Sequence, residues 1–246
     1  MRNLVLADIH SNLEALQAVL RDAEEAGGFD ALWCLGDTVG YGPDPGPCID
    51  LLRSHDPLAV AGNHDLALLG TIGVREFNPM AMEAIEWSRE QITDDQRSFL
   101  AGLATRHEAG PFTLVHGSPR EPVWEYFHPM YTPIEALHDS FSHFSTPYCL
   151  VGHSHVPFVC QEMGPTFVKF PEGEPYVLTK KDRLVVNPGG VGQPRDGDPR
   201  PSYVIYDDEA MTLVRRRVAY DVDAVQRKMR RAGIAEYLVE RLTYGR

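Results

Sequence analysis

The sequence predicts a layered α/β or α+β domain in which two β-sheets pack face to face. Short apolar runs typical of strands alternate with segments of helical period, which is the pattern of layered domains. The second half of the chain is richer in strand-like runs than in helical segments, so we expect the first half to supply most of the helices. No internal repeat, low-complexity tract or linker divides the chain. Residues 1–246 are therefore expected to form a single domain.

The expected strands are short apolar runs bounded by turn residues. Many are rich in Val, Leu, Ile or aromatic residues, and several are followed directly by Gly, Asp, Asn or His. In chain order they are residues 2–7, 31–35, 57–61, 112–116, 147–151, 156–161, 166–169, 183–187, 202–207 and 211–218.

Two capping boxes mark the starts of expected helices. Ser11 with Glu14 precedes the amphipathic stretch LEALQAVLRDAEEA, and Thr93 with Gln96 repeats the pattern. In such a box each of the two side chains satisfies a backbone N–H that the first helical turn leaves free. We therefore expect helices to begin just after residues 11 and 93.

Proline and aspartate indicate three further helix starts. Asn78–Pro79 and Thr132–Pro133 each place a capping residue ahead of a proline at the first helical position. Asp221 can cap a C-terminal helix. The turn-rich segment NPGGVGQPRDGDPRP, residues 187–201, is the longest expected loop.

The composition excludes several classes of protein. The formal net charge is −12, whereas a nucleic-acid-binding surface needs a basic stripe that displaces counterions. The four cysteines show no CxxC spacing, so neither a disulfide framework nor a sulfur-ligated metal site is expected. The N-terminal apolar run reaches Asp8 too early for a signal or membrane segment. We expect a soluble, cytoplasmic protein.

Acidic, amide and imidazole side chains follow five of the apolar runs. Ligands of open α/β sheets gather beyond the carboxyl ends of the strands, so five such ends can converge on one pocket. The five segments are Asp8–Ile9–His10, Gly36–Asp37, Gly62–Asn63–His64–Asp65, His116–Gly117 and Gly152–His153–Ser154–His155.

These segments offer oxygen and nitrogen donors without a thiolate. Such donors suit Mn²⁺, Fe or Zn²⁺, and Ni²⁺ would also fit. They are too many for one ion that keeps an open position, and about right for two divalent transition-metal ions that share one carboxylate. Two ions about 3.5–4 Å apart can polarise a phosphoryl oxygen, generate a hydroxide near neutral pH and steady the attacking and leaving oxygens.

The order of these motifs resembles the signature of the calcineurin-like metallophosphoesterase family. D-x-H, G-D, G-N-H-D, H and G-H-x-H follow one another from residue 8 to residue 155. The segments DIHSN, GDTVGYGPDP, HGSPR and NPGGVGQPRDGDPR are similar to those of its small bacterial and archaeal members. The resemblance implies a four-layer αββα sandwich, in which helices flank two mixed β-sheets.

The resemblance also assigns a role to each motif residue. It implies a first metal on Asp8, His10, Asp37 and His155, and a second metal on Asp37, Asn63, His116 and His153. Asp37 would bridge the two ions. His64 would hold the phosphate and protonate the leaving oxygen. Asp65 is expected to orient His64, because a carboxylate beside an imidazole can fix its tautomer.

The predicted activity is hydrolysis of a small phosphate ester by attack of a metal hydroxide, with phosphodiesters slightly favoured. Two divalent ions and two carboxylates leave a local charge of about +2, which attracts phosphate even on an acidic chain. The alternative enzyme is a phosphomonoesterase that acts on nucleotides or phosphoprotein. A further alternative is a non-catalytic, metal-bound interaction scaffold. Such a scaffold can lose its counterpart of His64, which is present here.

Loop residues near the motifs could shape the substrate pocket. We interpret Arg195, in the long loop, as a ligand of the substrate phosphate, since a guanidinium can hold two oxygens at once. The alternative is a surface hairpin without a binding role. For Tyr41, Arg120, Trp124 and Tyr126, a place in the pocket and a structural or surface role both stay open. Asn12 could likewise face the pocket or cap a helix.

Five histidines lack a position at a strand end, and we expect them to be structural or exposed. They are His55, His107, His128, His138 and His143.

Overall fold

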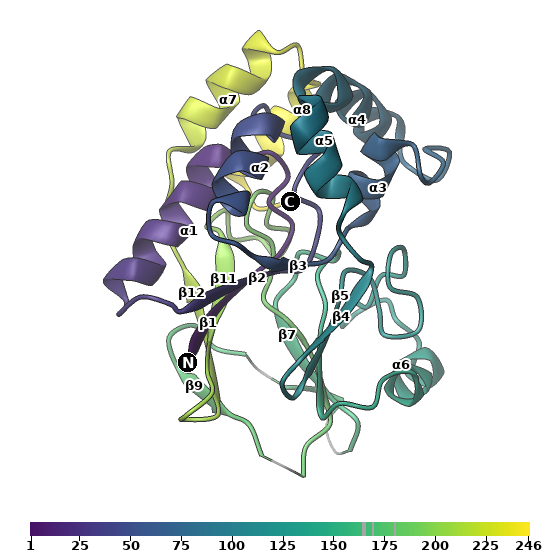
Figure 1. Cartoon of the computed structure of the whole chain (residues 1–246), viewed down its shortest axis with the longest axis vertical. Helices are drawn as coiled ribbons and strands as arrows, with labels where there is room; N and C mark the ends of the chain where they lie inside the picture. The colour runs from purple at the N-terminus through teal and green to yellow at the C-terminus, as the bar shows by residue number, and fades with distance from the viewer. Residues whose placement is uncertain (164–165, 169, 180) are drawn as a thin grey trace.

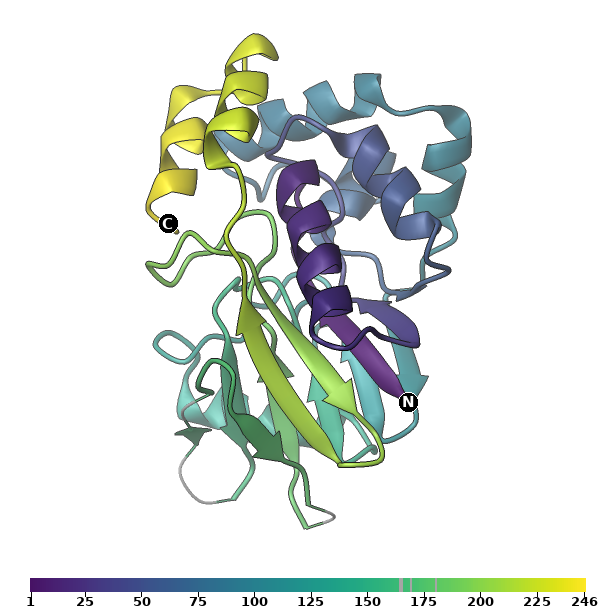
Figure 2. The same ribbon diagram turned by 90° about the vertical axis from the view of Figure 1, so that its left-hand side faces the viewer.

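The computed structural model describes the chain except for residues 164–165, 169 and 180. In the described part, two six-stranded sheets pack against each other and helices cover their outer faces (Figures 1 and 2). This is the four-layer αββα arrangement that the sequence and its family resemblance predict.

The first sheet is built around the N-terminal strand. Its strand order is β3-β2-β1-β11-β12-β9. The first three run parallel, and β1 pairs antiparallel with β11 in the register Leu4↔Ile205. The bounds are β1 Arg2–Leu6, β2 Ala31–Cys34, β3 Leu58–Ala59, β9 Pro175–Val177, β11 Ser202–Asp207 and β12 Thr212–Arg217.

The second sheet repeats the parallel core with antiparallel edges. Its strand order is β4-β5-β6-β10-β7-β8, in which β5, β6 and β10 run parallel. The bounds are β4 Arg106–Ala109, β5 Phe112–Val115, β6 Tyr148–Leu150, β7 Phe158–Gln161, β8 Phe167–Val168 and β10 Leu184–Asn187.

The main core lies between the two sheets. Trp33 and Tyr206 of the first sheet pack against Phe112 of the second, with ring centroids 5.7 and 4.8 Å from that of Phe112. Side chains alternate between this interface and the outer faces, as the period of a strand requires. On the outer faces, α1 packs on Leu4 and Leu6 of β1, and α6 packs on the second sheet.

The remaining helices gather above one end of the sheets (Figure 1). They form two further clusters of apolar side chains, one of which joins residues 41–84 to residues 225–242. The bounds are α1 Leu13–Glu25, α2 Pro45–Arg53, α3 Asn63–Leu69, α4 Pro79–Gln91, α5 Asp94–Ala101, α6 Ile134–Ser140, α7 Val222–Arg231, α8 Glu236–Glu240, and the 3₁₀ turns η1 Phe141–His143 and η2 Arg241–Thr243.

Each predicted strand has a counterpart, but the sequence missed β4 and β9. β4 reads RHEA and β9 reads PYV, and both are short and polar or exposed, so neither carries an apolar run. The expected strand 166–169 appears as β8, and its residue 169 lies outside the described residues. The loop predicted at 187–201 connects β10 to β11.

Three of the five predicted helix caps are confirmed. Thr93 forms its capping box with Gln96, and Asn78 and Asp221 each accept a backbone hydrogen bond. The box predicted at Ser11 is wrong, because Asn12 accepts the N–H of Ala15 instead.

The cap predicted at Thr132 is also wrong. The helix begins at Ile134, with Pro133 in the capping position. The hydroxyl of Thr132 accepts the N–H of His128 and donates to the carbonyl of Tyr126, so it closes the preceding turn.

No helix in the described residues is both long and apolar enough to cross a bilayer.

Candidate metal centre

The predicted donor side chains meet where the parallel strands of both sheets end. Asp8 and His10 follow β1, and Asp37 follows β2. His116 follows β5, and the GHSH segment follows β6. All the proposed donors are at most 4% exposed, and they are Asp8, His10, Asp37, Asn63, His116, His153 and His155.

Five of these residues hold a left-handed backbone conformation. Their φ angles lie between 46° and 62°, where a side chain is rarely found, and they are Asp8, His10, Asp37, His153 and His155. Such a residue costs about 1–3 kcal/mol and persists only where its surroundings enforce it. The surrounding structure therefore enforces the backbone at each of these donors.

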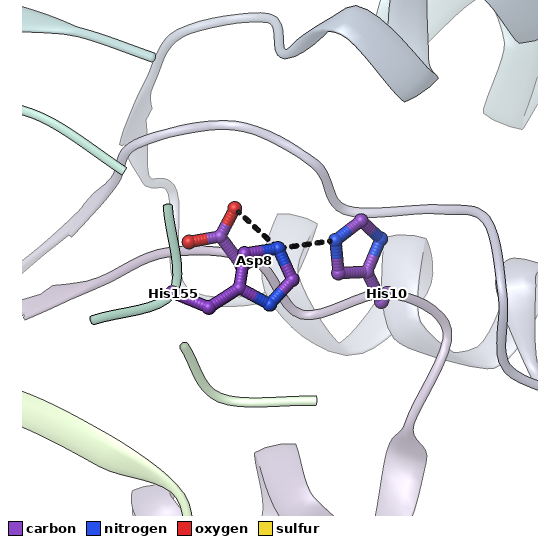
Figure 3. A group of neighbouring side chains, drawn as sticks. All are labelled: Asp8, His10 and His155. Atoms are coloured by element: carbon purple, nitrogen blue, oxygen red, sulfur yellow. Dashed lines mark hydrogen bonds and ion pairs between the residues drawn. The ribbon is translucent and has the colours of Figure 1, made fainter. Parts of the chain in front are cut away.

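One group of donors consists of Asp8, His10 and His155 (Figure 3). His155 Nε2 lies 3.1 Å from His10 Nε2 and 3.4 Å from Asp8 Oδ1. The far nitrogen of each ring faces a backbone carbonyl, that of Val39 for His10 and that of Gln193 for His155.

A second group surrounds His116. Its Nε2 lies 3.1 Å from Asn63 Oδ1, 3.2 Å from His153 Nδ1 and 3.3 Å from Asp37 Oδ2. Its Nδ1 is 2.7 Å from the carbonyl of Leu35. The same Asp37 oxygen lies 3.5 Å from His10 Nε2, so this carboxylate stands between the two groups.

The hydrogen bonds to carbonyls fix which nitrogens are protonated. A carbonyl only accepts, so the Nδ1 atoms of His10 and His155 carry the protons, and both Nε2 atoms point lone pairs at each other. Two lone pairs 3.1 Å apart repel unless a cation lies beside them. Carbonyl-oriented imidazoles of this kind are typical of metal ligands. The donors present therefore fit a divalent metal.

Burial and the Asp37 carboxylate act in opposite directions on the imidazoles of the site. Burial by itself lowers the pKa of His116, but the Asp37 carboxylate outweighs burial and raises it to about 9. Burial lowers the pKa values of His10, His153 and His155 well below the ordinary range. Three of the four imidazoles are thus neutral and ready to ligate at neutral pH.

Comparison with known proteins identifies the family. Residues 1–211 match the calcineurin-like phosphoesterase superfamily domain. The chain belongs to this superfamily. It is a hydrolase that acts on phosphate esters, as the sequence predicts. The superfamily uses divalent metals, and three groups of candidate ligands occur in the described residues.

Relatives of this phosphoesterase occur in bacteria and archaea. A crystal structure of a metallophosphoesterase from Sphaerobacter thermophilus is 41% identical over 100% of this chain and 99% of that chain, with a TM-score of 0.89. An uncharacterised protein of Methanocaldococcus jannaschii is 38% identical over 98% of this chain and 97% of its own length. A symmetrical bis(5'-nucleosyl)-tetraphosphatase of Psychromonas ingrahamii is 38% identical, but the match covers 50% of this chain and 46% of that protein.

His64 lies against the donor groups of the phosphoesterase and is 3% exposed. Its backbone N–H donates to Asp37 Oδ1 over 2.9 Å, and its ring packs against His10, Tyr41 and Phe77. Burial lowers its pKa to about 4. Its Nδ1 has no hydrogen-bond partner among the described residues.

The predicted contact between Asp65 and His64 is not formed. The Asp65 carboxylate instead accepts the backbone N–H groups of Thr38, Val39 and Gly62. Side chains at adjacent helix positions diverge, so the sequence neighbour of His64 cannot reach its ring. Asp65 ties the start of α3 to the loop after β2 that carries Asp37.

Arg195 reaches the donor groups from the long loop. Its Nη1 donates to Tyr126 Oη over 3.1 Å and its Nη2 to Gln193 Oε1 over 3.0 Å, while its guanidinium lies over the Tyr41 ring at 5.7 Å. With donor residues it lines a cavity of about 100 Å³, whose walls are Asp37, Tyr41, Asn63, His64, Glu76, Phe77, Asn78, Trp124, Tyr126, His153, His155 and Arg195.

Of the other loop residues that could shape the pocket, three line the cavity and one lies on the surface. Tyr41, Trp124 and Tyr126 line the cavity, and the Trp124 carbonyl lies 3.1 Å from His153 Nε2. Arg120 instead forms surface ion pairs with Glu125 and Asp139.

Two further residues were left open or missed by the sequence. Asn12 caps α1 and donates to the carbonyl of Gly192, so its side chain serves the backbone. Phe77 contacts both His64 and Trp124, with ring centroids 5.0 and 4.7 Å apart. It precedes a helix rather than following a strand, which is why the search for strand ends did not find it.

Proposed function

We propose that this chain is a binuclear metal-dependent phosphoesterase that hydrolyses a small phosphate ester, with phosphodiesters favoured. Asp37 bridges the two ions. The first ion takes Asp8, His10, Asp37 and His155, and the second takes Asp37, Asn63, His116 and His153.

One observation carries this proposal: imidazole nitrogens of both donor groups converge on one oxygen of Asp37. His10 and His116 approach the same Asp37 oxygen at 3.5 and 3.3 Å. One carboxylate oxygen between two imidazole groups suits a bridging ligand. Divalent ions bound there would polarise the phosphoryl group and lower the pKa of a water nucleophile.

The chain's own side chains bind and orient the ester. Arg195 holds a non-bridging oxygen of the phosphate, because its guanidinium borders the same cavity as the donors. His64 donates a proton to the leaving oxygen. Its low pKa in the free chain requires that the negative charge of the bound phosphate ester raise it, as a nearby opposite charge does.

The small volume of the cavity favours a substrate that places only a small group at the reaction centre. Its volume of about 100 Å³ is well below the roughly 300–1,000 Å³ of pockets that enclose whole drug-sized ligands. A phosphate fits inside, while the rest of the ester extends past Phe77 and Trp124. The aligned tetraphosphatases favour a nucleotide as the second candidate substrate, since aromatic rings at the rim can stack on a base.

The first test removes the bridge. Asp37→Ala deletes a ligand from each ion, so elemental analysis of the reconstituted protein should fall from about two ions per chain to none, and activity should be lost. Asp139→Ala is the matched control, because this exposed carboxylate pairs with Arg120 on the surface.

An Asp37→Ala protein with normal metal content and full activity would refute the bridge. The substrate class is tested separately, by assaying metal-loaded wild type on monoesters, diesters and dinucleoside polyphosphates. Hydrolysis of none of them, with both ions bound, would favour the interaction scaffold.

A further inference from the structure

The loop between β10 and β11 packs directly against the segment between β1 and α1. The N–H of Gly192 donates to the carbonyl of Asp8 over 2.8 Å, and the carbonyl of Gly192 accepts a hydrogen bond from Nδ2 of Asn12 over 2.9 Å. A Cβ at residue 192 would lie 1.8 Å from the carbonyl oxygen of Ile9, so only glycine allows this approach. The next residue, Gln193, is therefore held beside the donor groups, and it is 1% exposed.

Gln193 contacts the proposed metal centre and Arg195 at the same time. Its backbone carbonyl accepts a hydrogen bond from Nδ1 of His155, and its side-chain Oε1 accepts one from Nη2 of Arg195 over 3.0 Å. The Nη1 of Arg195 donates to Oη of Tyr126 over 3.1 Å, and the Tyr126 ring packs on His153 with centroids 4.0 Å apart. Two residues that contact histidines of the proposed centre thus also hold the guanidinium.

Both oxygens that hold Arg195 are neutral. An amide oxygen and a phenol oxygen accept hydrogen bonds from a guanidinium without cancelling its charge. Among the described residues, no carboxylate lies within ion-pair distance of Arg195, whereas Arg120, Arg200 and Arg217 each pair with one. The Nε of Arg195 is buried and has no hydrogen-bond partner in the same part of the chain. Arg195 therefore borders the cavity with its orientation fixed and its charge uncompensated by an ion pair.

We propose that Gln193 and Tyr126 are positioning residues, which hold Arg195 through neutral oxygens so that its full charge acts on the substrate phosphate. This inference rests on the proposed function, which places the reacting phosphate beside Arg195. A carboxylate at position 193 would orient the guanidinium as well as the amide does. It would also compete with the phosphate for the same charge, because carboxylate and phosphate accept the same two-pronged hydrogen bonds.

The first test is Gln193→Glu, which keeps the shape and the accepting oxygen but adds a negative charge. Calorimetry on the metal-loaded protein should show that orthophosphate binds about tenfold more weakly, the scale of one charge-assisted hydrogen bond. The melting temperature and the metal content should not fall, because the new ion pair with Arg195 replaces the original hydrogen bond. Gln17→Glu is the matched control, since it adds the same charge on the exposed face of α1.

The second test is Tyr126→Phe, which removes the hydroxyl and keeps the ring. On a diester it should raise KM more than it lowers kcat, and it should weaken orthophosphate binding several-fold. In an Arg195→Gln background the same change should cause no further loss, because the hydroxyl acts through the arginine. Tyr131→Phe is the control, since this tyrosine belongs to the same loop and is 74% exposed.

Two results would overturn the positioning role. One is unchanged orthophosphate affinity in Gln193→Glu, and the other is a loss from Tyr126→Phe that persists in full without the arginine. Failure of the proposed function looks different. Wild type would then neither hydrolyse an ester nor bind orthophosphate, or Arg195→Gln would bind orthophosphate as tightly as wild type does.

Discussion

At the residue scale, the proposed centre depends on backbone carbonyls as much as on its donors. The carbonyls of Val39, Leu35 and Gln193 each accept a hydrogen bond from the Nδ1 of one imidazole, which turns its other nitrogen inward. Each carbonyl belongs to a loop beside the site, so the loops determine the tautomers. A donor set of this kind is preorganised before any ion arrives.

His64 gives the first prediction at this scale. His64→Ala should keep both ions and lower kcat about 10²–10⁴-fold, the usual contribution of a general acid. The loss should shrink for esters with very acidic leaving groups, which need no proton. A series of aryl phosphate esters measures this dependence, and an equal loss across the series would indicate phosphate positioning instead.

Arg195 gives the second prediction at the residue scale. Arg195→Lys keeps the charge but loses the two-pronged geometry, so KM should rise several-fold while metal content stays the same. Arg120→Lys is the matched control, because Arg120 pairs with surface carboxylates. Steady-state kinetics on a diester and a monoester measure this change in KM. Unchanged KM values for Arg195→Lys would show that Arg195 does not bind the substrate.

At the element scale, the loop after β2 holds the site together. It carries Asp37, and its Gly40 has a φ of +91°. A Cβ at Gly40 would lie 2.3 Å from His64 Nδ1, so glycine is required both for the turn and for the approach of the ring. The same loop supplies Tyr41 to the cavity wall.

Gly40→Ala should therefore lower both stability and activity. Gly173→Ala is the control, because Gly173 has a φ of +76° but nothing within 4 Å of an added Cβ. In each variant, backbone strain should lower the free energy of unfolding by about 1–3 kcal/mol. Only Gly40→Ala should also reduce kcat, since it displaces His64. Equal kcat values for the two variants would show that the ring tolerates the contact.

The extent of successful prediction also varies by element. The sequence identified the strands that carry the donors because buried parallel strands read as apolar runs. It missed β4 and β9, since edge strands need no apolar face, and it chose Ser11 over Asn12 because both are good capping residues. The convergence of the motifs was predictable from their positions after strands, whereas the partners of Asp65 depend on loop geometry.

At the scale of the whole molecule, the buried charges link metal binding to pH. His116 has a pKa of about 9 in the metal-free fold, above its ordinary value of 6.5. The folded chain therefore holds a proton that the unfolded chain releases. This contribution to stability is complete below about pH 6.5 and is lost as the pH rises through 9.

The melting temperature of the metal-free chain should therefore fall between pH 7 and 9. The imidazoles with lowered pKa values are largely neutral in both states in this window. Burial also raises the pKa values of Asp8 and Asp65 to about 7 and that of Cys34 to about 12, so these groups add to the fall that His116 causes. Added Mn²⁺ should stabilise the fold more at pH 9 than at pH 7, because it no longer competes with that proton. Thermal unfolding with and without chelator measures both effects, and His116→Gln should flatten the slope. A rising melting temperature in wild type would contradict this linkage.

The pairing of β1 with β11 also determines when, during synthesis of the chain, the site can be completed. Asp8 and His10 follow a strand whose neighbour begins at Ser202, and the N–H of Gly192 closes on the carbonyl of Asp8. At about 5–20 residues per second, a ribosome needs about 10–40 s to make the intervening chain. The first donors to emerge are thus among the last to be enclosed. Metal binding to the complete site then follows near-complete translation. Until that point, other molecules that bind histidine side chains compete for the donors of the nascent chain.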